Sequence, residues 1–247
     1  MENNLKKIQD LRFYPSAYSD VIKQQIWSIA GNLGNNFLIC IESHLPNNKW
    51  YMPNTEILYI DCANFKDIEY YLYTKIGDDK YGWMSEVRVH MDEEEFLRKK
   101  TETEKRLLIW SKIKEGILKF INLFPDYPFD KDIIEKVYET EMKNDFFLQV
   151  SKIYSSRDNK FEIHLEMQPE STGKKYYLAL EEKGSYSKYF IADVEPSSME
   201  NISKWRYPKA KKWIGHKFYL DYNSSSVSSE IIFDADKKTI EIIDKIE

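Results

Sequence analysis

The chain has 247 residues, of which 42% are hydrophobic, 15% aromatic and 31% charged, and this composition excludes an intrinsically disordered polymer. Its 36 basic and 41 acidic residues give a net charge of −5, so the chain as a whole lacks the positive field that binds nucleic acid or anionic lipid without specificity. At about 150 residues per domain, one large domain or two modest ones would fit, and we expect a folded, soluble protein.

The N-terminal part of the chain combines helix-like and strand-like patterns. Ser19 is a suitable N-cap for a helix whose apolar residues recur every three or four positions from Ile22, and Gly31 and Gly34 are expected to end it. Two continuous apolar runs then predict strands that are buried on both faces. These runs are residues 37–41 and 57–60.

The next segments predict a short helix, a strand and a well-marked helix start. Apolar spacing indicates the short helix over residues 68–76, and alternation over 86–91 predicts a strand with one face open to water or to a cleft. Asp92 followed by Glu95 is typical of a helix N-terminus. Because residues 98–106 are polar on every face, either one long helix or two helices that meet within this segment would fit.

The pattern changes again in the second half of the chain. A helical apolar stripe runs from Trp110 to Phe124, Pro125 follows it, and a further helix is expected over 130–143. From Phe146 onward the apolar period is two, and turn residues separate about seven predicted antiparallel strands.

These patterns together predict an α+β fold. We expect an N-terminal α/β-like region with a small buried sheet over residues 1–125 and a helical connector over 126–145. The C-terminal region, residues 146–247, is expected to be a mostly antiparallel β-sheet with a short helix near 198–205.

No membrane segment is expected, because the longest apolar run, residues 37–41, is far shorter than the roughly 20 residues of a membrane helix. The N-terminus lacks the apolar segment of a signal peptide, so we expect a cytoplasmic protein. Cys40 and Cys62 both fall in apolar runs, where a free cysteine behaves as a small hydrophobic side chain. We therefore expect two buried thiols.

Sequence motifs for cofactor, nucleotide and metal chemistry are absent. The eight glycines include no G-x-G, which excludes the dinucleotide fingerprint, and neither a P-loop nor a G-x-S-x-G nucleophile elbow is present. The sequence also has no C-x-x-C and no H-E-x-x-H. We expect no cofactor and no metal, and catalysis becomes a weaker expectation than binding.

Three of the four histidines have an acidic residue two positions away, a spacing that puts both side chains on one face of a strand. Such pairs suit metal binding or acid/base catalysis, but polar strand faces also collect His and Glu without any function. The candidate catalytic residues are Glu42 with His44 and Asp92 with His90. His90 stands out because it ends a strand just before a helix. His164, between Glu162 and Glu166, is expected on an ordinary half-exposed sheet face.

Residues 204–213 contain five basic and three aromatic residues and no acidic one. This segment could grip phosphates and stack bases, or meet an acidic protein partner. Alternatively, its tryptophans anchor an irregular crossover onto the sheet while its lysines stay in water, which the pI near 5.6 favours. The candidate binding residues are Lys204, Trp205, Arg206, Lys211, Lys212 and Trp213.

Two aromatic loops are further candidates for a binding surface. Trp50 and Tyr51 lie in a predicted loop between two buried strands, and Trp83 lies in a second turn of the same kind. Aromatic residues on loops are typical of interface hot spots, although these side chains could equally fold back onto the core.

The sequence therefore favours a non-catalytic cytoplasmic protein that binds another protein. A bacterial immunity or inhibitor protein, which occludes the active site of its partner, fits this description, although no motif ties the chain to such a family. The alternative is a hydrolase or transferase with His90 as general base and Asp92 or Glu42 as its orienting acid. Nucleic-acid binding through residues 204–213 ranks third.

Overall fold

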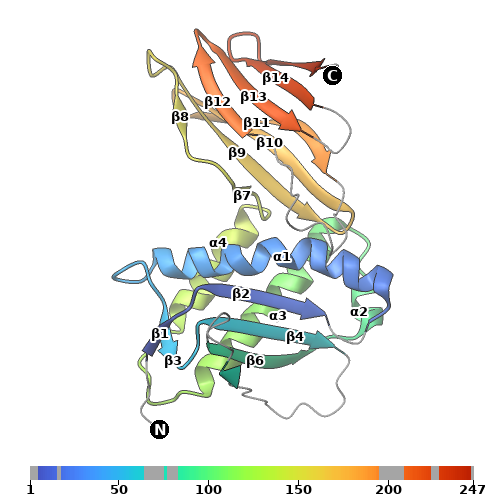
Figure 1. Ribbon diagram of the computed structural model, residues 1–247, viewed down its shortest axis with the longest axis vertical. Helices are drawn as coiled ribbons and strands as arrows, with labels where there is room; N and C mark the ends of the chain where they lie inside the picture. Colours follow the sequence, from blue (N-terminus) through green and yellow to red (C-terminus); the bar gives the residue numbers. More distant parts are fainter. Residues whose placement is uncertain are drawn as a thin grey trace. The chain divides into compact units, whose positions relative to one another are not determined.

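The computed structural model describes residues 5–15, 18–63, 75–76, 83–194, 209–223 and 228–245. The fold is α+β with mostly antiparallel sheets, as the sequence predicted (Figure 1). Contacts within the chain divide it into two compact units. Unit 1 comprises Met1–Phe146 and Pro169–Ser171, and unit 2 comprises Phe147–Gln168 and Thr172–Glu247. No helix in the described part of the chain is long and apolar enough to span a membrane.

The main sheet of unit 1 has the strand order β2-β4-β6-β5, in which β2, β4 and β6 are parallel. Side chains alternate along these strands, so the paired residues Phe13, Ile60 and Val87 lie on one buried face. Two further strands, β1 and β3, form a separate antiparallel pair. The strands are β1 (Leu5–Lys7), β2 (Asp10–Pro15), β3 (Tyr51–Pro53), β4 (Ile57–Ala63), β5 (Lys75–Ile76) and β6 (Trp83–His90).

The strands expected over 57–60 and 86–91 are confirmed by β4 and β6. Of the helix expected over 68–76, residues 68–74 lie outside the described residues. Residues 75 and 76 form the strand β5 and not a helical turn.

Helix α1 (Asp20–Ser43) corrects two predictions. Neither Gly31 nor Gly34 ends it, and the strand expected over residues 37–41 is wrong because this run continues the helix. Phe37 and Ile41 extend the buried stripe of the helix, whereas Ile39, which a doubly covered strand would bury, is 64% exposed. Gly34 instead permits close packing on β2, since a Cβ there would lie 2.7 Å from the carbonyl oxygen of Leu11.

Two helices meet within the polar segment 98–106, where residues 98–101 separate them. Helix α2 (Glu93–Leu97) begins at Asp92, as predicted, and α3 (Glu102–Asn122) begins with a capping box formed by Thr101 and Glu104. Helix α3 packs closely on the sheet, because a Cβ at Gly116 would lie 2.7 Å from the Ile60 side chain. Helix α4 (Asp132–Lys143) packs against α1 and α3 within unit 1.

Unit 1 also holds a short segment from later in the chain, Pro169–Ser171. The Glu102 carboxylate accepts hydrogen bonds from the Ser171 backbone N–H at 2.6 Å and from its hydroxyl at 2.7 Å. The buried Arg106 guanidinium donates to the Pro169 carbonyl oxygen at 3.1 Å and also pairs with Asp145 at 3.4 Å. The first turns of α3 therefore fix this segment with charge-assisted bonds.

Unit 2 consists of two antiparallel sheets that share one hydrophobic core. The first, the β9–β11 sheet, has the order β11-β10-β9-β7, and β8 also pairs with β9; the second, the β12–β15 sheet, is consecutive. The strands are β7 (Leu148–Gln149), β8 (Tyr154–Ser155), β9 (Phe161–Glu170), β10 (Gly173–Glu182), β11 (Ser185–Val194), β12 (Lys209–Ile214), β13 (Lys217–Asn223), β14 (Ser228–Asp234) and β15 (Thr239–Lys245). Alternate residues of both sheets, such as Ile163, Leu178 and Phe233, form the core.

The alternation in the second half of the sequence is confirmed in β9, β10, β11, β13, β14 and β15. The irregular crossover considered for the basic segment is wrong over residues 209–214, which form the edge strand β12. The helix expected near 198–205 lies outside the described residues.

The two cysteines are free thiols. Cys62 is fully buried at the end of β4, as expected, whereas Cys40 is half-buried on α1. Burial, reinforced by the nearby Glu141 carboxylate, raises the pKa of Cys40 to about 12, so this thiol is inert at neutral pH.

Candidate functional site

The residues proposed around His44 serve the end of helix α1. His44 Nδ1 lies 2.8 Å from the Cys40 carbonyl oxygen, so the ring bonds to the last turn of its own helix. The Glu42 carboxylate accepts from the Trp50 backbone N–H at 3.2 Å and pairs with Lys7 at 3.4 Å. Neither side chain is oriented by the other.

His90 and Asp92 lie near the other end of α1, where Ser19 contacts Glu93. His90 is the last residue of β6, and its Nδ1 is buried without a hydrogen-bond partner among the described residues. Asp92 accepts from the Glu94 backbone N–H at 3.0 Å and therefore caps α2. The 24 residues of α1 span about 36 Å, and His44 follows the last of them, so the two candidate pairs lie at opposite ends of this helix.

The first aromatic loop contributes to the core of unit 1. Trp50 is 1% exposed and packs against the rings of Phe120 and Phe129. This side chain therefore folds back onto the core and does not lie on a binding surface. Tyr51 remains accessible at 36% exposure on β3, where it pairs with Lys7. Trp83 begins β6, and its side chain lies outside the described residues.

In the described part of the basic segment 204–213, one side chain anchors the strand and two lysines lie at the surface. Lys204, Trp205 and Arg206 lie outside the described residues. Trp213 is an anchor, because its indole N–H donates to the Tyr154 carbonyl oxygen at 3.0 Å. Lys212 is exposed. The Lys211 ammonium pairs with Asp221 at 2.6 Å, so this lysine already has an anionic partner within the sheet.

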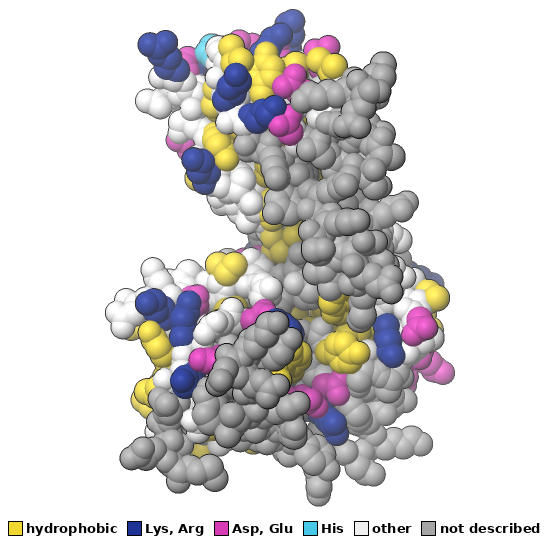
Figure 2. Space-filling model, viewed as in Figure 1, with side chains coloured by type: hydrophobic (Ala, Val, Ile, Leu, Met, Phe, Trp, Pro, Cys, Tyr) yellow, Lys and Arg dark blue, Asp and Glu magenta, His cyan; other side chains and the backbone are white. Residues whose placement is uncertain are grey.

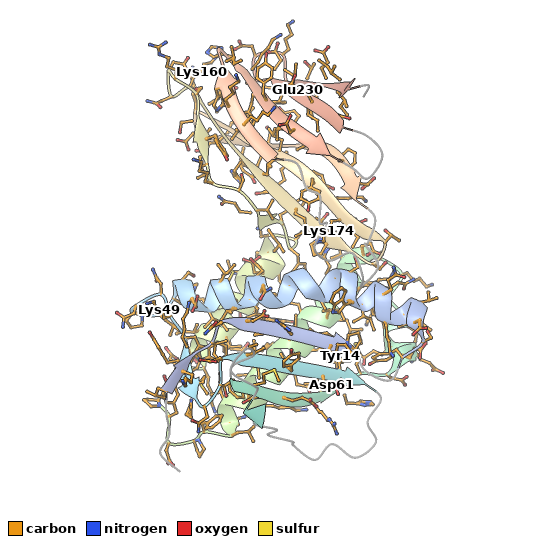
Figure 3. The ribbon with its side chains drawn as sticks, in the orientation of Figure 1. Tyr14, Lys49, Asp61, Lys160, Lys174 and Glu230 are labelled. Carbon is orange, nitrogen blue, oxygen red and sulfur yellow. The ribbon has the colours of Figure 1, made fainter. Side chains whose placement is uncertain are left out.

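One side of the unit 1 sheet, opposite the face that packs on α1 and α3, carries polar side chains. Tyr14, Asp61 and Arg88 occupy paired positions on β2, β4 and β6, and Figure 3 shows Tyr14 and Asp61 on these adjacent strands. The Arg88 guanidinium lies 3.8 Å from Asp61 and 3.2 Å from Glu86. The Arg88 guanidinium is thus shared between two carboxylates. Within the described ranges, no three His, Cys, Asp or Glu side chains are arranged to hold a metal ion.

A different arrangement occupies the outward side of the β9–β11 sheet, where three donors surround one carboxylate. Glu166 is only 5% exposed. Its carboxylate lies 3.1 Å from His164 Nε2 and 2.8 Å from Lys188 Nζ, and it accepts a further hydrogen bond from the Tyr186 hydroxyl. The three donors come from β9 and β11, so this network fixes side chains on strands that lie two apart in the sheet.

The electrostatics of this network fix the protonation states of Glu166 and Tyr186. Burial alone would raise the pKa of Glu166, but the hydrogen bonds from His164, Lys188 and Tyr186 outweigh burial and lower it to about 2. Burial and the bond to Glu166 raise the pKa of Tyr186. At neutral pH, Glu166 is therefore ionised and Tyr186 protonated. Neither is poised near neutrality, as a general acid or base would be.

Aromatic side chains adjoin this network on the same side of the sheet. The Lys188 ammonium lies 3.2 Å from the centre of the Phe147 ring, and Tyr177 packs edge-on against both Phe147 and Phe190. Tyr186 and Phe190 are each 50% exposed. We name this surface the β11 face; its residues are His164, Glu166, Tyr177, Tyr186, Lys188 and Phe190.

The β11 face was missed among the sequence candidates, although its signal was present. Tyr186, Lys188 and Phe190 alternate with Tyr189 and Ile191, which pack in or against the core. This alternation places the first three on the opposite face of β11. Two large aromatic residues on an outward strand face are the unusual feature.

Compared with protein-family models, with curated proteins and with solved structures, the chain matches none. Its function must therefore be argued from its own side chains.

Proposed function

We propose that this protein is a non-catalytic protein-binding module that engages its partner through the β11 face. The observation that carries the proposal is the half-exposure of Tyr186 and Phe190 beside the buried Glu166 carboxylate, to which the Tyr186 hydroxyl donates. Large aromatic side chains at the centre of an interface contribute most of its binding energy. These two have the size and the position for such a role.

The network beneath the aromatic residues supports binding in a second way. Tyr186 is held by its bond to Glu166, and Phe190 packs edge-on against Tyr177. Because both rings are already ordered, they would lose less conformational entropy when a partner binds than mobile side chains would. Rigid aromatic anchors of this kind suit a protein that occludes a cleft of its partner, as an immunity or inhibitor protein does.

The protonation states favour binding over catalysis. Glu166 stays ionised and Tyr186 stays protonated over the whole neutral range, so neither would exchange a proton with a substrate there. In unit 1, Asp92 caps a helix and His44 bonds to its own helix end. Because Asp92 is used as a helix cap, it does not support the hypothesis that it orients His90 as a general base.

The test is capture of the tagged protein from its own cells, followed by mass spectrometry of whatever is retained in near-equal amount. We would compare the wild type with the double variant Tyr186→Ala, Phe190→Ala. A hot-spot residue contributes about 2 kcal/mol of binding free energy, so each substitution is expected to lower the affinity for the partner about thirtyfold. The double variant should lose the partner while its circular dichroism spectrum stays that of the wild type.

Two matched controls make the result specific. Ile39→Ala removes an apolar side chain that is 64% exposed on α1, and it should leave capture unchanged. Tyr51→Ala tests the rival aromatic surface of unit 1, where the side chain is 36% exposed. Loss of the partner with Tyr51→Ala, together with retention by the double variant, would move the binding surface to unit 1 and overturn the assignment to the β11 face.

A further inference from the structure

The fourth histidine, His216, bridges two turns at one end of unit 2. It lies in the turn between β12 and β13, where its Nε2 is 2.9 Å from Asp158 Oδ2 and its Nδ1 is 2.8 Å from Asp236 Oδ2. Asp158 belongs to the turn between β8 and β9, and Asp236 to the turn between β14 and β15. The histidine therefore connects the β9–β11 sheet to the β12–β15 sheet.

This geometry requires a charged ring. A neutral imidazole has one N–H group and one bare nitrogen, so it can donate to only one of the two carboxylates. The bare nitrogen would then face an anionic oxygen at hydrogen-bond distance, which is repulsive. Only the imidazolium, with a proton on each nitrogen, satisfies both Asp158 and Asp236.

The surroundings of His216 hold the ring and its partners in place. The His216 carbonyl oxygen accepts from the Ala235 backbone N–H at 2.9 Å, and the edge of the ring meets Phe161, with centroids 5.1 Å apart. Asp158 uses its other oxygen to accept from the Ser156 hydroxyl at 2.7 Å. These contacts align the ring with its two carboxylate partners.

The charges around His216 balance only when it is protonated. The Lys160 ammonium, at the start of β9, lies 3.1 Å from Asp236, so the cluster holds two carboxylates, one ammonium and the imidazole. Figure 3 labels Lys160 at this end of unit 2, and Figure 2 shows acidic and basic side chains interspersed there. With the imidazolium the cluster is neutral, and without the proton it carries a net negative charge.

We propose that His216 is a pH-sensitive clasp that ties the two sheets of unit 2 together at their turns, closed while the ring is an imidazolium and released when it loses a proton. The bonds to Asp236 and Asp158 raise the pKa of His216 above its ordinary 6.5, and the same contacts lower the pKa of both carboxyl groups. The clasp is therefore closed from mildly acidic to near-neutral pH. It opens as pH rises through the raised pKa of His216.

The first test is an NMR titration of the imidazole ring nitrogens in the full-length protein, from about pH 5 to about pH 9, the range in which histidine changes charge. The His216 signals are assigned by their loss in His216→Gln. We expect them to report an imidazolium with a pKa above 6.5. In Asp158→Asn and in Asp236→Asn, this pKa should fall, whereas Asp193→Asn, an exposed change elsewhere in unit 2, should leave it unchanged.

The second test reads the opening itself. Because the Ala235 N–H bonds to the His216 carbonyl oxygen, its amide exchange should accelerate above the His216 pKa by more than the intrinsic effect of pH. The His216→Gln variant should lose this additional step. A wild-type pKa at or below 6.5, or an Ala235 exchange rate with no step at the His216 titration, would overturn the clasp.

Discussion

The two polar sheet faces of this protein use their charges in different ways. On the unit 1 sheet, the Arg88 guanidinium is shared between the carboxylates of Asp61 and Glu86. On the β11 face, the donors converge on Glu166, and the aromatic side chains Tyr186 and Phe190 remain at the surface. The difference is that several donors converge on one carboxylate beside exposed aromatic rings on the β11 face, whereas two carboxylates share one cation on the unit 1 sheet.

The largest expected effect follows from removing the central acceptor. Glu166→Gln removes the buried charge that His164, Tyr186 and the half-buried Lys188 share, and we expect a loss of about 3 kcal/mol in the free energy of unfolding. Glu86→Gln is the matched change on the unit 1 sheet, where a partly exposed pair should cost less than about 1 kcal/mol. Urea denaturation followed by circular dichroism measures both. Equal losses would erase the distinction between the two faces.

Tyr186→Phe isolates one bond of the network. The variant keeps the aromatic ring and removes the hydroxyl that donates to Glu166, so we expect a loss of about 2 kcal/mol in the free energy of unfolding. Binding of the partner should weaken less than with Tyr186→Ala, because the ring remains. A stability equal to that of the wild type would mean that the Glu166 carboxylate is already satisfied by His164 and Lys188 alone.

Acid should destabilise the wild type through the same carboxylate. Hydrogen bonds lower the pKa of Glu166 from 4.5 to about 2, so the ionised form stabilises the fold fully above pH 4.5, and this contribution is lost as pH falls towards 2. The Glu166→Gln variant lacks this group and should show a shallower loss of stability over that interval. Urea midpoints measured at several pH values check the slope, and parallel slopes for the two proteins would argue against an ionised, bonded Glu166.

The smallest effect on stability is expected at the exposed ring. Phe190→Ala should change the free energy of unfolding by less than about 0.5 kcal/mol, because the side chain is 50% exposed. Partner capture should nevertheless fall. A large loss of stability would show instead that Phe190 supports the packing of Tyr177 rather than binding.

Periodicity predicted most of the fold, and its failures have physical reasons. A five-residue apolar run such as 37–41 fits a buried strand or one turn and a half of a buried helix, and only the stripe of the whole helix from Ile22 to Ile41 decides between them. Glycine often ends helices, which explains the stop predicted at Gly34, whereas here this glycine permits the contact with Leu11. The edge strand β12 has too few apolar residues to show alternation.

The sites were harder to predict, because their partners are distant in sequence. An acidic residue two positions away drew attention to His44 and His90. Among the pairs with this spacing, His164 and Glu166 lie within hydrogen-bond distance. His216 escaped this criterion, since its two acids lie 58 and 20 residues away along the chain. Only the pairing of strands in unit 2 brings these turns together.

The segment Pro169–Ser171 has a consequence for the order of events during synthesis. Unit 1 is completed by a segment that the ribosome makes after the first strands of unit 2, so Arg106 and Glu102 must wait for their Pro169 and Ser171 partners. In a nascent chain that ends near Phe146, Arg106 and Glu102 on α3 would lack their hydrogen bonds to Pro169 and Ser171. Unit 1 therefore matures only once translation has passed the hairpin between β9 and β10.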